Sequence, residues 1–287
     1  MDYFFTQIFN GLSIGAIYAL IAIGFSMVYG VLRLLNFAHS ELITIGAYTP
    51  FVISTYFFKN TEISLLDTFG LFLLSAIVSG LFAVAFFYIG YKSVYRKSRI
   101  AVLISAIGIS VLMQSLIIFF FSAKSHATVF PNLDYSMVGI FLLVMVLLLI
   151  TWMLKGTQLG IWMRAVSDDY DIARLMGIKP SRVIVAVFFI GGALAGLAGC
   201  IISMQTGSIN PRMGYSYGLK AFAISVVGGI GNIWGATLVG ILLGMAEVLF
   251  HAFLPDEINH FSDAFAFILL LTILFYKPKG LFTKYLS

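Results

Sequence analysis

The feature that most constrains the fold of this chain is a recurrence of apolar stretches, each about as long as a lipid bilayer is thick. A helix of roughly 20 apolar residues crosses about 30 Å of hydrocarbon, and backbone amides in lipid have no water to bond with. Each stretch is therefore expected to form a membrane-spanning helix. The expected spans cover residues 7–30, 38–58, 67–91, 101–122, 136–154, 183–205 and 259–276.

A further apolar stretch over residues 219–250 is too long for one ordinary span and contains a break. The break consists of Gly228, Gly229, Gly231, Asn232 and Gly235. Irregular backbone at membrane depth persists only inside protein or beside a wet cavity. The sequence predicts a helical hairpin or a re-entrant, broken helix here, with a flexible turn between two ordinary helices as the alternative.

These stretches predict an all-α polytopic membrane protein with about eight transmembrane helices, folded as a single transmembrane domain over residues 1–287. Only 10% of the 287 residues are charged, which is too few to cover a water-facing surface. The basic residues lie between apolar spans, so the net charge of +5 indicates orientation in a bilayer and not nucleic-acid binding.

The distribution of lysine and arginine predicts which ends of the spans face the cytoplasm, because short cytoplasmic loops are enriched in these residues. The residues expected on the cytoplasmic side are Arg33, Lys92, Arg96, Lys97, Arg99, Lys155, Arg164, Arg174, Lys179, Arg182, Lys277, Lys279 and Lys284. Those expected outside are Lys59, Lys124, Arg212 and Lys220. The loop 156–182 and the C-terminus are therefore expected in the cytoplasm. Both flanks of the 219–250 stretch are expected outside, so this stretch must cross the membrane an even number of times.

Several spans carry small residues four positions apart, which places them on one helix face. They are Gly11, Gly15 and Ala19; Gly192 and Gly196; Ala195 and Gly199; and Gly240 and Gly244. Small side chains let neighbouring helix backbones come close. We expect dense packing of a helical bundle at these faces, with the lining of a narrow passage as the alternative.

The segment RAVSDDYDIARLMGIKPSRV, residues 164–183, concentrates charge in a chain that is otherwise apolar. Its pattern predicts a short cytoplasmic helix over residues 168–177. Ser167 is the expected cap, and Gly177 suits the position just past the helix end. Asp168, Asp169 and Asp171 are expected in the first turn, where the helix dipole favours anions. Arg174 is expected near the end of the helix.

Within that predicted helix, Ile172, Leu175 and Met176 form an apolar patch together with the small Ala173. So short a helix is marginal in water unless something packs on it. We therefore expect the patch to dock on a soluble protein, with the charged ends setting the orientation. The alternative is a solvated connector.

Polar side chains inside the spans are the candidates for lining a passage, because polar groups in lipid are costly and often functional. They are Asn10, Ser13, Tyr18, Asn36, His39, Glu41, Gln114 and Glu247. Hydrogen bonding between helices is the alternative for each. His39 and Glu41, with Arg33 and Asn36 just before them, are expected to lock the turn between the first two spans through mutual hydrogen bonds, with lining of an inner gate as the alternative. No metal site is expected, because one histidine and one carboxylate are too few ligands.

DIARLMG, residues 171–177, is similar to the loop that integral subunits of ABC importers insert into a cleft on their ATPase subunits. Five longer blocks show a wider similarity, namely NGLSIGAIYALIAIGFSMVYGVLRLLNFAHSELITIGAY, RAVSDDYDIARLMGI, FFIGGALAGLAG, QTGSINPRMGYSYGLKAFAISVVGGIGNIWGATLVGILLGMAE and DAFAFILLLTILFYKPKGLF. In these blocks the chain resembles the LivH-type permease subunits of high-affinity branched-chain amino acid ABC importers. The chain differs from many relatives at Tyr170, where proline is common, and in GNIWGA, where GSIPGA is common.

The resemblance implies a multi-pass subunit of the bacterial or archaeal plasma (inner) membrane. It implies a second related permease subunit, two cytoplasmic ATPase subunits, and an extracytoplasmic binding protein that delivers leucine, isoleucine or valine. This chain is expected to be no enzyme and to bind no cofactor, with ATP and Mg²⁺ used by the partner subunits. The sequence contains no GxxxxGK[ST] phosphate loop, which agrees with energy supplied from outside this chain.

The leading interpretation is half of an ATP-driven pore for branched-chain amino acids. Because urea-carrying relatives share much of the pattern, urea or a short-chain amide is the alternative cargo. A passive channel would need no docking helix. An intramembrane enzyme would need a nucleophile and a base at one depth, or paired carboxylates, and Glu41 and Glu247 are the carboxylates expected well inside spans.

Overall fold

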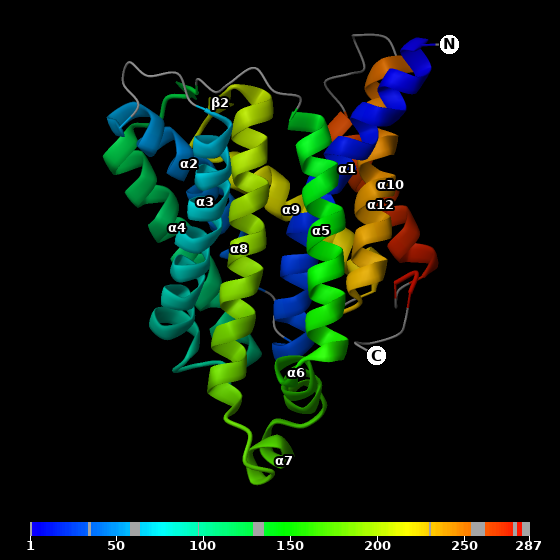
Figure 1. Cartoon of the computed structure of the whole chain (residues 1–287). Helices are drawn as coiled ribbons and strands as arrows, with labels where there is room; N and C mark the ends of the chain where they lie inside the picture. The colour runs from blue at the N-terminus through cyan, green and yellow to red at the C-terminus, as the bar shows by residue number, and fades with distance from the viewer. Residues whose placement is uncertain are drawn as a thin grey trace.

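The computed structural model describes residues 2–33, 36–57, 64–96, 98–128, 135–229, 231–253, 262–277 and 280–282, and this part of the chain is predominantly helical (Figure 1). The helices are α1 (Asp2–Leu32), α2 (His39–Phe57), α3 (Leu65–Phe86), the π-helix η1 (Phe87–Tyr91), α4 (Arg99–Phe121), α5 (Tyr135–Gly156), α6 (Gln158–Asp168), α7 (Tyr170–Leu175), α8 (Pro180–Thr206), α9 (Met213–Gly228), α10 (Ile233–Phe253) and α12 (Ser262–Tyr276). Two short strands, β1 (His126–Ala127) and β2 (Ser208–Ile209), pair antiparallel. The predicted all-α fold class is confirmed.

Six of the described helical segments are long and apolar enough to cross a membrane, namely α1, α3 with η1, α4, α5, α8 and α10. The helices α2, α9 and α12 add 19, 16 and 15 residues respectively. The most apolar part of α1 is 89% buried, whereas that of α4 and of α5 is 28% buried. The first helix is therefore a central element of the bundle, and α4 and α5 present large apolar side chains outward, such as Phe119 and Leu148.

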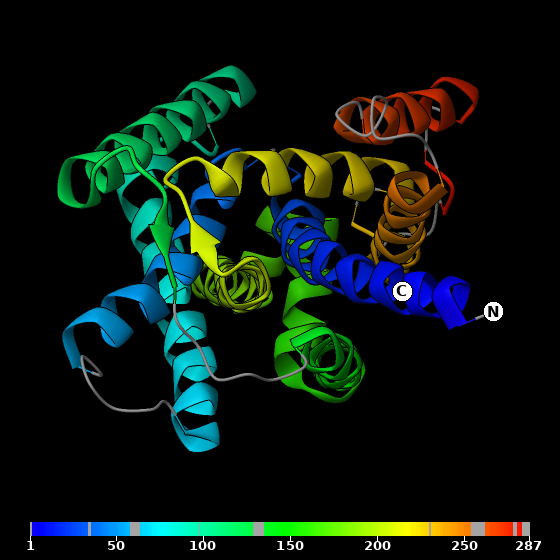
Figure 2. The same cartoon turned by 90° about the horizontal axis from the view of Figure 1, so that it is seen from above.

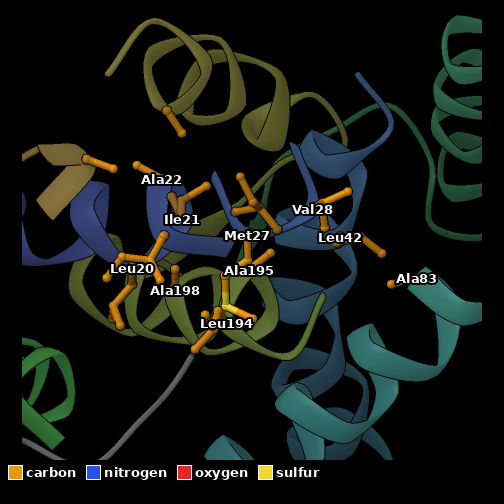
Figure 3. Packing of buried hydrophobic residues seen from close by; sticks show 14 of the residues in the cluster. Leu20, Ile21, Ala22, Met27, Val28, Leu42, Ala83, Leu194, Ala195 and Ala198 are labelled. Carbon is orange, nitrogen blue, oxygen red and sulfur yellow. The ribbon is translucent and has the colours of Figure 1, made fainter. Parts of the chain in front are cut away.

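The core forms where α1 and α8 meet, with α2 and α3 alongside (Figure 3). Leu20 and Ile21 of α1 lie in one buried cluster with Leu194, Ala195 and Ala198 of α8. No water is displaced between helices in lipid, so contact quality between small and branched side chains supplies the cohesion.

The small residues four positions apart are where helix backbones touch. A Cβ atom added to Gly244 of α10 would lie 2.2 Å from the backbone nitrogen of Gly15 in α1. On α8, a Cβ atom added to Gly199 would lie 2.0 Å from the carbonyl oxygen of Ile43 in α2. These faces are helix–helix contacts, as the packing interpretation predicts.

The predicted break in the 219–250 stretch is present as a turn between α9 and α10. Gly229 and Gly231 have φ values of 101° and 83°, a conformation that glycine adopts without strain. Leu281 donates its backbone N–H to the carbonyl of Val227 at 2.7 Å, and the Asn232 amide donates to the carbonyl of Phe282 at 3.2 Å. The chain at residues 281–282 therefore covers part of this turn.

The helix α9 is a short, strongly tilted element. Its 16 residues extend about 24 Å, less than the hydrocarbon thickness. Figure 2 shows α9 lying across a view in which α8 is seen end-on. Because α9 begins at Met213, ahead of the predicted stretch, Lys220 lies inside the helix and is buried, not outside as its charge suggested.

The two ends of the helical bundle carry different secondary-structure elements. The α7 helix lies beyond one end, and the β1–β2 pair lies at the other (Figure 1). Ser167 of α6 donates its hydroxyl to the carbonyl of Gly30, near the end of α1, at 2.7 Å. A Cβ atom added to Gly231 in the α9–α10 turn would lie 3.2 Å from the Cα atom of Gly30. The α1 end, α6 and the hairpin turn therefore meet at the α7 end of the molecule.

Candidate functional site

The charged segment after α5 folds into two helices, and not into the single helix over 168–177 that the sequence suggested. Asp169 has extended backbone (φ −149°, ψ 117°) and separates α6 from α7. Its carboxylate accepts hydrogen bonds from the backbone N–H groups of Asp171 and Ile172, both at 2.9 Å. The cap is therefore Asp169 and not Ser167, whose hydroxyl is used by Gly30, and Asp168 is the last residue of α6.

The end of α7 agrees with the sequence, because Gly177 takes a φ of 85° just past the helix. The large side chains of the predicted patch are exposed, Ile172 by 59%, Leu175 by 87% and Met176 by 79%. Ala173 was grouped with them but is only 3% exposed and belongs to the buried cluster. The exposed apolar patch of α7 thus consists of Ile172, Leu175 and Met176.

The short helix α7 is tied to the connection between η1 and α4. Arg96 donates to both carboxylate oxygens of Asp171, at 2.9 and 3.2 Å, and its guanidinium lies 4.5 Å from the centre of the Tyr170 ring. The hydroxyls of Tyr95 and Tyr170 are 2.9 Å apart. Burial raises the pKa of Tyr95 to about 12, so its hydroxyl remains protonated near neutral pH. Tyr170 therefore supplies two of the contacts that hold α7.

A cavity of about 490 Å³ lies between α1, α8, α9 and α10, and we name it the charged cavity. Exposed side chains form its rim, namely Thr206, Ser216 and His251. Buried or half-buried apolar side chains form its wall, namely Ile14, Ile17, Ile202 and Val248. The rim residues lie near the end of α8, the start of α9 and the end of α10, so the cavity belongs to the half of the bundle away from α7.

Two charges and a phenol lie at the buried floor of the charged cavity. The Lys220 ammonium lies 2.5 Å from Oε1 of Glu247, and Tyr18 donates its hydroxyl to Oε2 of Glu247 at 2.7 Å. The same ammonium donates to the Tyr18 hydroxyl at 3.1 Å. Tyr18 and Glu247, separate candidates in the sequence, are thus brought together. Nearby, Gln205 donates its amide to the hydroxyl of Ser13 at 3.1 Å.

Lys220 is the functional candidate that sequence reasoning missed. It was counted as an external loop charge, because the apolar stretch was taken to begin just before it. The signal that identifies it is the burial rule, since a lysine inside a membrane helix needs an acidic partner, and Glu247 is an intramembrane carboxylate.

A second cavity, of about 370 Å³, lies on the other side of α9. We name it the amide cavity, because Asn36 and Gln114 line it together with the hydroxyls of Ser40 and Ser110. Its apolar wall includes Phe25, Phe37, Ile107, Val111, Leu219 and Phe222. Two more of the predicted residues thus share one space, between the start of α2, the middle of α4 and one face of α9.

The predicted mutual bonds of His39 and Glu41 are wrong. Glu41 accepts hydrogen bonds from Ser110 of α4 at 2.8 Å and from the adjacent Ser40 at 3.3 Å. The His39 ring lies edge-on to Phe25, with ring centres 5.7 Å apart. Asn36 accepts instead from the hydroxyl of Tyr91 in η1 at 2.5 Å.

The partners of this turn therefore come from helices distant in sequence, which local spacing does not reveal. Asn10, the remaining candidate, is half-buried and is not among the residues that line either cavity.

A bundle of membrane-length helices with polar cavities between them, and a short tethered helix beyond one end, defines an α-helical membrane transport protein. A family model described as the permease component of the branched-chain amino acid transport system matches residues 7–274. The chain belongs to this family.

Curated relatives match along nearly the whole chain. The chain is 34% identical to the high-affinity branched-chain amino acid transport system permease protein LivH of Salmonella typhimurium, over 97% of this chain and 95% of that protein. It is likewise 34% identical to the corresponding permease protein BraD of Pseudomonas aeruginosa, with the same coverage of both chains. A probable LivH of Methanocaldococcus jannaschii is 25% identical over 91% of this chain and 87% of that protein.

Among solved structures, the chain is similar to PsaBC from Streptococcus pneumoniae in complex with Fab. The TM-score is 0.51, with 16% identity, and the match covers 94% of this chain and 91% of that one. At this identity the likeness supports the fold alone.

Proposed function

We propose that this chain is an integral permease subunit of an ATP-driven importer for leucine, isoleucine and valine, and forms half of the translocation pathway. The observation that carries this proposal is the 34% identity, over 97% of the chain, to permeases named for high-affinity branched-chain amino acid transport. The same names favour an amino acid over urea or a short-chain amide as cargo. A second related permease subunit completes the pore in the inner membrane, and the C-terminus lies in the cytoplasm.

In this proposal two cytoplasmic ATPase subunits hydrolyse ATP with Mg²⁺, and an extracytoplasmic binding protein delivers the substrate. The α7 helix docks on an ATPase subunit. Support comes from its exposed patch of Ile172, Leu175 and Met176, because such side chains favour a partner that covers them. The Arg96–Asp171 ion pair helps to hold α7 against the bundle, so that a displacement of α7 by the ATPase subunit is transmitted to the membrane helices.

The route for the substrate runs past the two cavities that flank α9. Their polar side chains include five of the sequence candidates, Tyr18, Asn36, Gln114 and Glu247 as lining groups and Glu41 as the acceptor for Ser110. The apolar walls suit an aliphatic side chain. A route of this kind binds its cargo weakly enough to release it.

The test is uptake into proteoliposomes that contain the complete importer, with its binding protein outside and ATP inside. Labelled leucine is expected to accumulate against its gradient only when ATP is present. The matched control carries an ATPase subunit whose phosphate-loop lysine is replaced. Equilibration of leucine without ATP would establish a passive channel, and accumulation of labelled urea in place of leucine would establish the amide alternative.

A further inference from the structure

We propose that the charged cavity is a transit subsite for the zwitterionic α-amino acid group of the substrate. Lys220 binds the α-carboxylate and Glu247 binds the α-ammonium. This inference rests on the proposed function and adds to it the place in the permease where an amino acid is told apart from a neutral amide.

The first argument is the cost of the ion pair. Lys220 is 5% exposed and Glu247 is 7% exposed, both inside helices of a membrane bundle. Taking two charges out of water is costly for each ion, and a hydrophobic contact links two helices as well as a buried ion pair does. A costly pair at the floor of a cavity therefore points to recognition, whereas a merely structural contact could form without charges.

The second argument is charge balance during binding. The two side chains neutralise each other at 2.5 Å in the structure. When the pair opens around a zwitterion, Lys220 faces a carboxylate and Glu247 faces an ammonium, so neither charge is left without a counterion. The Tyr18 hydroxyl, which already donates to Glu247, remains beside both groups as a third polar contact. Urea carries no charges, so opening the pair around urea would leave each buried ion without a counterion.

The third argument is shape. The cavity volume of about 490 Å³ falls within the range of small-molecule sites, about 300–1,000 Å³. Ile14, Ile17, Ile202 and Val248 offer an apolar wall beside the charged floor. A branched aliphatic side chain and a zwitterionic head therefore each find a matching surface.

The position fits delivery from outside. Exposed Thr206, Ser216 and His251 form the rim, and exposure decreases from there to Lys220 and Glu247. The rim lies at the end of the bundle opposite α7. With α7 in the cytoplasm, as proposed above, the cavity is the one a substrate meets when it arrives from a binding protein.

The competing explanation is a structural lock, in which the pair only joins α9 to α10. Single substitutions leave a buried charge unpaired and disturb folding, so the test uses paired variants in the complete importer. The neutral pair Lys220→Gln/Glu247→Gln removes both charges with little loss of volume. The reversed pair Lys220→Glu/Glu247→Lys restores an ion pair with opposite polarity. Lys124→Gln, an exposed lysine on the same side, is the matched control.

The measurements are assembly with the ATPase subunits, ATP hydrolysis without substrate, ATP-driven leucine uptake, and leucine binding by saturation-transfer NMR on nanodiscs lacking the binding protein. We expect both paired variants to assemble and to keep substrate-independent ATP hydrolysis. We expect leucine uptake to fall, and the Kd for leucine to rise, roughly 10-fold to 100-fold, as removal of charge-assisted hydrogen bonds predicts. The control is expected to match the wild type.

Wild-type uptake and leucine binding in the neutral pair would overturn the proposed subsite. Full recovery of uptake in the reversed pair would also overturn it, because a structural lock predicts that recovery. Failure of both pairs to assemble would also count against it, because it would show that the charges serve folding. In each of these cases wild-type leucine uptake persists and the proposed function stands. Absence of ATP-driven leucine uptake in the wild type would instead refute the proposed function.

Discussion

Replacing Leu175 and Met176 with serine is expected to release the ATPase subunits without unfolding the permease. Both side chains lie at the end of α7, 87% and 79% exposed, so the isolated chain loses little buried area when they are removed. Their effect on the stability of the isolated permease should stay within about 0.5 kcal/mol, as for other exposed positions.

The effect on docking should be much larger. Full burial of a leucine or methionine side chain against a partner is worth about 1.5–3 kcal/mol. Each lost side chain therefore weakens the ATPase complex by roughly 10-fold to 150-fold, and the double variant by more. If the patch faces water in the assembled importer, the cost is close to zero instead.

The assay is co-purification of ATPase subunits with tagged permease, together with the thermal stability of the permease and leucine uptake. Ile161→Ser on α6 is the matched control, since it removes an apolar side chain of 56% exposure from the same connection between α5 and α8. Wild-type recovery of ATPase subunits with the double variant would refute docking through this patch. Equal loss with Ile161→Ser would refute its specificity.

Three further variants test the packing of α10 on α1 and the contacts that hold α7 in place. Gly244→Ala places a methyl group 2.2 Å from a backbone nitrogen of α1, so it should lower the free energy of unfolding by about 1–3 kcal/mol or more. Its control is Gly108→Ala, whose added methyl group meets nothing within 4 Å, and equal melting temperatures of the two variants would contradict the close contact. Arg96→Met breaks a largely exposed ion pair with Asp171 and should lower stability by less than about 1 kcal/mol, so a melting shift as large as that of Gly244→Ala would show a buried role. Asp169→Ala removes the cap of α7 and should cost about 1 kcal/mol locally, seen as faster amide hydrogen exchange in α7 alone, whereas unchanged exchange would contradict capping.

Hydropathy predicted the bundle because lipid exposure requires long apolar helices whatever the tertiary arrangement. The glycine break predicted the α9–α10 turn for a similar local reason, since Gly229 and Gly231 adopt positive φ. The boundary of α7 was harder. Ser167 and Asp169 are both good caps, and the choice depends on a hydrogen bond from Ser167 to Gly30, 137 positions away.

The candidate sites show the same limit. Polar residues inside spans correctly singled out Tyr18 and Glu247, because lipid excludes such groups unless they have partners. Which residues meet depends on how distant helices pack. Lys220 reaches Glu247 only because α9 folds back along α10, and Glu41 reaches Ser110 only because α4 lies beside α2. Spacing along the chain carries no record of these approaches.

The arrangement around α9 links the two cavities to each other. Ser216, Tyr217 and Lys220 face the charged cavity, whereas Leu219 and Phe222 line the amide cavity. Because one short helix is a wall of both cavities, a displacement of α9 would change the shape of both.

The α9–α10 turn also packs on the end of α1 that lies nearest α7. Gly231 of that turn packs on Gly30, and the carbonyl of Gly30 accepts the hydrogen bond from Ser167 at the end of α6. In the proposed importer, a displacement of α7 carried by α6 would therefore reach the end of α1 through the Ser167–Gly30 hydrogen bond, and the α9–α10 turn through its packing on Gly30. The junction of α1, α6 and this turn is where a movement of α7 would enter the bundle.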